Sequence, residues 1–114
     1  MTTEQENIEI CLRLLGWRRH PDPELSGWYA PPDDRCFMNS AVHKQFPTFS
    51  TWADAGLILD ALRAHKVTLI NLGCAELERW ECGIAAPGFE QAFIDESGPL
   101  AIRSAALEYI RSLP

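Results

Sequence analysis

The chain has 114 residues, of which 46% are hydrophobic and 23% are charged, and its formal net charge is −6. This composition is typical of a single globular domain and excludes an intrinsically disordered chain. No run approaches the roughly 20 apolar residues of a membrane-spanning helix, and the polar N-terminus lacks the pattern of a secretory signal. The acidic balance argues against broad, phosphate-driven binding of nucleic acids. We therefore expect one cytoplasmic domain over residues 1–114, with no membrane contact.

An amphipathic helix is predicted over residues 4–15. Thr3 and Glu6 have the spacing of a capping box, which satisfies exposed amide donors in the first turn. Gly16 fits the helix end because glycine tolerates a left-handed backbone conformation. Four apolar side chains recur at helical spacing on one face: Ile8, Cys11, Leu12 and Leu15.

The stretch over residues 17–47 holds five of the eight prolines and predicts short strands and loops. Residues 26–30 and 36–38 are the two candidate strands of a hairpin, joined by a turn at residues 31–34. Residues 39–48 are expected to form an irregular loop.

A second helix is predicted over residues 52–65, capped by Ser50 or Thr51. Its apolar side chains are expected to lie toward the core, and we expect Trp80 there too. The apolar line consists of Trp52, Ala55, Leu59 and Leu62, with Ile58 beside it.

A second hairpin is predicted from residues 67–72 and 77–84, with its turn at residues 73–75. On the returning strand, side chains alternate between a face with Trp80, Cys82 and Ile84 and a face with Arg79, Glu81 and Gly83. Residues 89–95 are open between helix and strand.

A third helix follows residue 97. Ser97 is its predicted cap, and Pro99 is compatible with the first turn. Its apolar face consists of Ile102, Ala105, Ala106, Tyr109 and Leu113. The order helix, hairpin, helix, hairpin, helix predicts an α+β fold, in which three helices pack on a small antiparallel sheet of three or four strands.

The sequence contains little that indicates catalysis, and we expect a protein that is not an enzyme. It has no GxSxG elbow and no glycine-rich phosphate loop, and its three histidines lie in separate segments. The four cysteines show no CxxC spacing and are expected to be small buried hydrophobes. Cys36 and His43 come nearest to metal-ligand spacing, and no metal or cofactor is expected.

Aromatic and basic side chains form the candidate ligand site. An exposed aromatic ring near cations can stack on a base or hold a partner. The alternative is that Trp28 packs on the first helix and Tyr29 covers a loop. The candidate residues are Arg18, Arg19, Trp28, Tyr29, Arg35, His43 and Lys44.

Three segments together carry a resemblance to a known family. They are residues 14–17 (LLGW), residues 46–50 (FPTFS) and residues 97–107 (SGPLAIRSAAL). In this order they resemble the small phage and prophage proteins of the phage ABA sandwich domain family. The resemblance implies an α/β/α sandwich and an origin in a phage or prophage, and it implies no reaction.

Three functional hypotheses follow. The first is a phage or prophage accessory protein that acts by binding, and in one version an oligomer sequesters a nucleotide signalling molecule of host defence. The second is an interaction module that binds a host protein through an acidic surface, with Glu78, Glu81 and Glu90 in one patch. The third is a small hydrolase, which requires a cleft with a histidine and a neighbouring acid.

Overall fold

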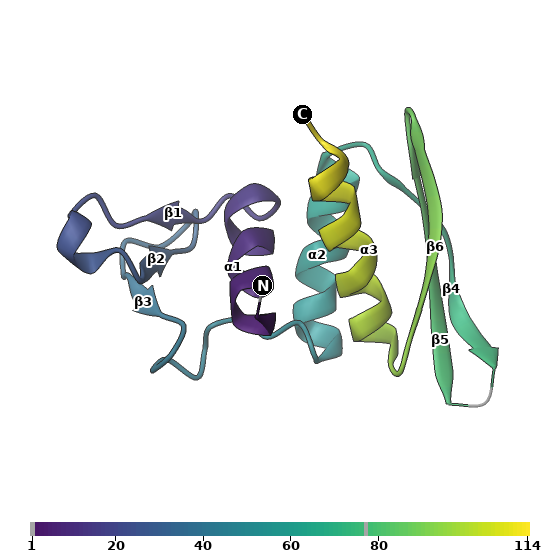
Figure 1. Cartoon of the computed structure of the whole chain (residues 1–114), viewed down its shortest axis with the longest axis horizontal. Coiled ribbons are helices and arrows are strands. Elements are labelled where there is room, and N and C mark those ends of the chain that lie inside the picture. Colours follow the sequence, from purple (N-terminus) through teal and green to yellow (C-terminus); the bar gives the residue numbers. More distant parts are fainter. Residues whose placement is uncertain (1, 77) are drawn as a thin grey trace. The chain divides into compact units, whose positions relative to one another are not determined.

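Helices and antiparallel strands alternate along the chain, which confirms the α+β class (Figure 1). The computed structural model describes residues 2–76 and 78–114. Within these residues the strands form two three-stranded antiparallel sheets, where the sequence predicted one sheet. The chain divides into two compact units, one up to Thr48 and one from Phe49 onward. The three-layer α/β/α arrangement and the single domain stay predictions.

The first unit begins with a helix whose cap lies one residue earlier than expected. Helix α1 spans Thr3–Arg13 and is capped by Thr2. Gln5 N–H donates to the Thr2 hydroxyl over 3.2 Å, and Thr2 N–H donates to the Gln5 side chain over 2.7 Å. The predicted pair of Thr3 and Glu6 was wrong because both threonines precede a suitable side chain by three residues. At the other end, Gly16 has φ +78°, as predicted.

The buried face of α1 also differs from the predicted one. Ile8, Leu12 and Leu15 are only partly buried, although Cys11 is fully buried as expected. The buried positions are Asn7, Ile10, Cys11 and Leu14. Both sets have helical spacing, so the sequence alone does not separate the two faces.

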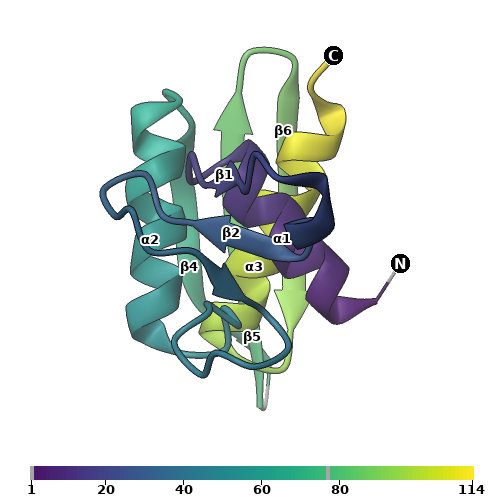
Figure 2. The same ribbon diagram turned by 90° about the vertical axis from the view of Figure 1, so that its left-hand side faces the viewer.

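Three short strands complete the first unit (Figure 2). Strand β2 (Trp28–Ala30) pairs with β1 (Arg18–Arg19) and with β3 (Met38–Asn39), and a 3-10 turn at Pro23–Leu25 lies between β1 and β2. The hairpin of β2 and β3 was predicted close to these positions. Strand β1 was not predicted, since two consecutive arginines carry no strand pattern.

The second unit is a three-stranded sheet with two helices packed on one face (Figure 1). Strand β5 lies between β4 and β6. Helix α2 is capped by Thr51, one of the two caps predicted, and helix α3 is capped by Ser97, as predicted. The elements are α2 (Trp52–Ala64), β4 (Thr68–Glu76), β5 (Arg79–Ala86), β6 (Phe89–Asp95) and α3 (Gly98–Ser112).

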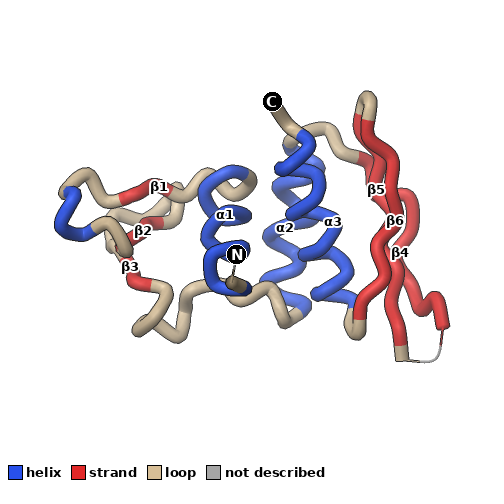
Figure 3. Tube along the Cα trace, in the orientation of Figure 1, coloured by secondary structure: helices blue, strands red, loops and turns tan. Residues whose placement is uncertain are grey.

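Two expectations for this unit are corrected or resolved. Residues 73–75 were predicted to be a turn, but they belong to β4, which continues to Glu76. Gly73 pairs with Glu81 inside the ladder, so the pairing of two long strands outweighs the local turn preference of glycine. Residues 89–95 form strand β6 along their whole length (Figure 3). Leu77, in the predicted second strand, lies outside the described residues.

The core of the second unit lies between the helices and one face of the sheet. Cys82 and Ile84 on β5 are fully buried, as predicted, but Trp80 is only partly buried and Gly83, expected on the more exposed face, is buried too. Helix α3 buries the predicted face except Leu113, which follows the helix and is exposed. Trp52 was wrongly placed in the core, because its side chain is 52% exposed. As the first residue of α2, it lies at the edge of the packed layer, with its ring 5.3 Å from that of Trp80.

Candidate functional site

The small sheet of the first unit divides the candidate ligand residues between its two faces. Arg18 pairs with Ala30, and Arg19 pairs with Tyr29. Since side chains alternate along a strand and paired residues share a face, Arg19 and Tyr29 lie on one face. Arg18 and Trp28 lie on the other. The seven candidates therefore do not form one site.

On the first face, Arg19 and Tyr29 line a hollow of about 700 Å³ together with α1. We call this hollow the α1 groove. Its volume lies within the range of small-molecule sites. The partly buried Ile8 and Leu12 form part of its wall. The remaining lining side chains are Gln5, Glu9 and Arg13.

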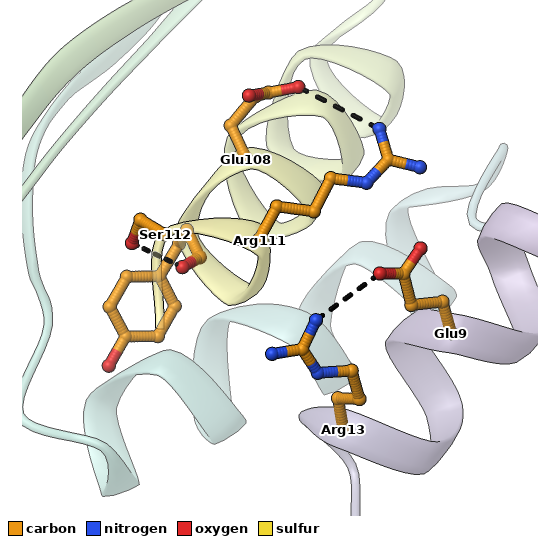
Figure 4. A network of polar contacts seen from close by, with 6 residues as sticks. Glu9, Arg13, Glu108, Arg111 and Ser112 are labelled. Atoms are coloured by element: carbon orange, nitrogen blue, oxygen red, sulfur yellow. Dashed lines mark hydrogen bonds and ion pairs between the residues drawn. The ribbon is translucent and has the colours of Figure 1, made fainter. Parts of the chain in front are cut away.

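Two guanidinium groups lie in the α1 groove. The Arg19 guanidinium lies 5.6 Å from the centroid of the Tyr29 ring. The Arg13 guanidinium pairs with the Glu9 carboxylate over 3.3 Å, one turn away on α1 (Figure 4). Arg19 forms no ion pair within the described residues. The groove therefore offers one unpaired cation, one paired cation and an apolar wall.

Tyr29 contributes mainly its ring to this arrangement. The side chain is 7% exposed, and its ring centroid lies 6.1 Å from that of Phe46 in the loop after β3. Trp17 packs on the same phenyl ring at 5.0 Å. The Tyr29 ring therefore covers a loop, as one sequence interpretation had it, and also supports Arg19.

On the opposite face, aromatic and cationic side chains form contacts among themselves. Arg18 lies 5.8 Å from the centroid of Phe37, and His20 packs on the same ring at 4.4 Å. The Arg18 guanidinium also donates to the Asp34 carbonyl over 2.6 Å. These contacts hold Arg18 against its own unit and direct it away from the α1 groove.

Trp28 also lies on this opposite face. Its ring packs edge-on against His43 with centroids 5.4 Å apart, and His43 Nδ1 accepts a hydrogen bond from Asn39 N–H over 2.9 Å. The interpretation that Trp28 packs on α1 is therefore wrong. Arg35 and Lys44 are exposed in loops and do not line the α1 groove.

The turn before β3 is ordered by Asp34. Its carboxylate accepts a hydrogen bond from Cys36 N–H over 2.9 Å, and this bond is the main reason that the pKa of Asp34 lies below its usual value. Arg18 adds a smaller effect in the same direction. Asp33 and Asp34 are exposed, as expected for a solvated turn.

A second hollow, of about 560 Å³, lies in the second unit where α2 ends and β4 begins. We call it the α2 pocket. The sequence analysis did not identify it, because its lining comes from two strands and a helix end whose side chains show no motif. The lining residues are Leu59, Asp60, Leu62, Arg63, Lys66, Val67, Thr68, Leu69 and Ile84.

Among the described residues, no cysteine or histidine lines the α1 groove or the α2 pocket. No group of three or more potential metal ligands occurs within residues 2–76 and 78–114. Cys11 and Cys82 are buried as predicted, whereas Cys36 and Cys74 are exposed, contrary to the expectation for all four cysteines. Neither the α1 groove nor the α2 pocket is lined by a histidine, so neither matches the cleft that a hydrolase requires.

Two residues of the predicted acidic patch, Glu81 and Glu90, lie apart on the sheet. Glu81 pairs with Ile94, and Glu90 pairs with Ala85, so both lie on the face opposite the helices. The small residues Gly83 and Ala92, which pair with each other, lie between them on this face. The two carboxylates are thus not neighbours, and Glu78 lies further along, before β5.

No helix in the described part of the chain has both the length and the apolar character needed to cross a bilayer. Comparisons with protein-family models, with curated proteins and with solved structures found no match to this chain.

Proposed function

We propose that this protein acts by binding rather than by catalysis, and that the α1 groove holds a small anionic ligand of the nucleotide class. The observation that carries the proposal is the unpaired Arg19 guanidinium above the Tyr29 ring, in a groove that also contains Arg13. A planar guanidinium binds phosphate oxygens in a bidentate manner, and a supporting ring restricts its orientation. Arg19 therefore supplies the anchor for a phosphate group.

Each other part of a nucleotide has a counterpart in the groove. Ile8 and Leu12 offer an apolar wall for the base or sugar. The Gln5 side-chain oxygen accepts the Thr2 N–H, so its amide nitrogen is the group left to contact a base edge. Arg13 can exchange its Glu9 partner for a phosphate oxygen, since both are charge-assisted hydrogen bonds.

A role in sequestering a signalling nucleotide rests on the family resemblance and stays a prediction. The surface proposed for the alternative, an acidic patch that binds a host protein, has less support because Glu81 and Glu90 are separated by small residues.

The test uses the adjacent arginines as a matched pair. Arg19→Gln is expected to weaken binding of a nucleoside monophosphate or a cyclic dinucleotide by about tenfold, because it removes one charge-assisted hydrogen-bonding group. Arg18→Gln removes the same charge from the opposite face and is expected to change the affinity by less than about twofold. Isothermal titration calorimetry with the full chain measures both.

Further ligands distinguish the chemistry that is recognised. Inorganic phosphate and adenosine are expected to bind more weakly than adenosine monophosphate, because each fills only part of the groove. Two results would overturn the proposal: no nucleotide binding at millimolar concentration, or equal losses for Arg18→Gln and Arg19→Gln.

A further inference from the structure

The α2 pocket combines an apolar lining with two cations and belongs entirely to the second unit. Leu62, Val67 and Ile84 are buried, and Leu69 is 43% exposed on β4. Leu69 pairs with Ile84, so the two share the sheet face that the helices cover. The pocket therefore has apolar side chains from a helix, from the segment that follows it, and from two strands.

Three charged side chains lie around this lining. Arg63 belongs to the last turn of α2, Lys66 follows the helix, and Asp60 lies one turn earlier. Within residues 2–76 and 78–114, neither Arg63 nor Lys66 forms an ion pair. The pocket thus carries a net positive charge, and both cations are available to an anion from outside.

Lys66 occupies a backbone position that normally takes glycine. Its φ is +63°, in the left-handed region, directly after the helix cap His65. Lys66 N–H donates to the Arg63 carbonyl over 3.0 Å, and Val67 N–H donates to the Leu62 carbonyl over 2.9 Å. A glycine would close the helix without strain. A strained non-glycine residue whose side chain lies at a pocket is a reason to look for a function of that side chain.

We propose that the α2 pocket binds a small amphiphilic anion, a molecule with an apolar body and one carboxylate or sulfonate group. The apolar body lies against Leu69 and Ile84, and the anionic group pairs with Lys66 and Arg63. The last carbonyls of α2 already accept N–H groups from the chain, so they offer little to a ligand that donates hydrogen bonds. This site is separate from the α1 groove and does not depend on the function proposed for it.

The test is fluorescence titration of the full chain with 8-anilinonaphthalene-1-sulfonate, followed by displacement with decanoate. Lys66→Gly is expected to weaken binding of both probes by about five- to tenfold. The same substitution is expected to raise Tm by about 3 to 6 °C, because it relieves the left-handed strain. Weaker binding by a more stable protein cannot be attributed to misfolding.

The matched control is Glu78→Gly. Glu78 also has φ +63° but does not line the α2 pocket, so its replacement is expected to raise Tm without weakening binding. Decanol and acetate, which lack the charge or the apolar body respectively, are expected to displace the probe poorly.

Three results would overturn the proposal. The first is an absence of probe fluorescence enhancement. The second is equal affinity in Lys66→Gly and the unmodified chain. The third is displacement by decanol as effective as that by decanoate, which would indicate an apolar surface with no anion recognition.

Discussion

Neighbouring residues in this chain have opposite surroundings because they lie on short strands. Arg18 is held by Phe37 and the Asp34 carbonyl, whereas Arg19 lies over Tyr29 in the α1 groove. The same principle separates Trp28 from Tyr29. At the residue scale, the direction of each side chain decides which cations and rings lie together. A shift of the strand register by one residue would move each of these side chains to the other face of the sheet.

Burial changes the acid–base behaviour of Cys82. It is fully buried on β5, and burial raises the pKa of its thiol from 9.0 to about 11. The thiol therefore stays protonated and unreactive at neutral pH. With 5,5′-dithiobis(2-nitrobenzoic acid) at pH 8, we expect two thiols, Cys36 and Cys74, to react quickly in the folded protein and all four to react after denaturation.

The same pKa shift predicts a loss of stability in alkali. Between pH 9 and pH 11 the unfolded chain releases the Cys82 proton while the folded chain keeps it. The free energy of unfolding therefore keeps its full value below pH 9 and falls as the pH rises through 11. The decrease due to Cys82 is at most about 2 to 3 kcal/mol. Urea denaturation between pH 8 and pH 11 measures it. Cys82→Ala should show a shallower decline than the unmodified chain, and parallel curves would contradict the assignment.

At the scale of elements, the start of α3 lies against the start of α2. Gly98, the first residue of α3, is buried, and a Cβ atom there would overlap the six-membered ring of Trp52. The Trp52 ring also contacts Trp80 of β5. A glycine thus lets a large aromatic side chain cover the junction of two helices and a strand.

Gly98→Ala is therefore expected to destabilise the fold by about 1 to 3 kcal/mol, because the Trp52 ring must move. Gly56→Ala is the matched control. A Cβ at Gly56, inside α2, meets no atom within 4 Å, so alanine is expected to stabilise the helix by about 0.5 to 1 kcal/mol. Thermal denaturation followed by circular dichroism compares them.

In a Trp52→Ala background, Gly98→Ala should destabilise the fold much less, because the ring that the new Cβ atom would overlap is absent. A Gly98→Ala protein as stable as Gly56→Ala would show that the contact with Trp52 is not restrictive.

At the scale of the whole molecule, the second unit has a hydrophobic core of its own. Helix α3 packs on β5, β6 and α2, and the β4–β6 ladder is continuous. The fully buried Ile84 and Ile102 both belong to this unit. The two helices of this unit bury the apolar side chains on one face of its sheet. This burial is what stabilises a domain in which helices pack on a sheet.

A fragment of residues 49–114 is therefore expected to fold alone. We expect a cooperative thermal transition in circular dichroism, with helical and strand signals before it. The same fragment with Ile102→Asp should lose this transition, because the substitution buries a charge. A fragment that melts without cooperativity while the full chain melts sharply would contradict this expectation.

Local sequence patterns were enough to identify the three helices, most of their caps and the α+β class. Thr51, Ser97 and Gly16 act within one helical turn, so their effect is visible in the sequence. The burial of Cys82 and Ile84 was predicted for the same reason, since residues two apart on a strand share a face. Family membership and ligand identity rest on no such local rule and stay predictions.

Only the tertiary structure decided the features that depend on contacts between residues far apart in the sequence. The register of β1 with β2 placed Arg19 beside Tyr29 and separated it from Arg18. Pairing of β4 with β5 kept Gly73 in a strand despite its preference for a turn. The α2 pocket needs Lys66 and Ile84, which are far apart in sequence, to meet across a helix end and a sheet. Such contacts form only when the chain folds, because hydrogen-bond ladders and packing select one register among several that local preference allows.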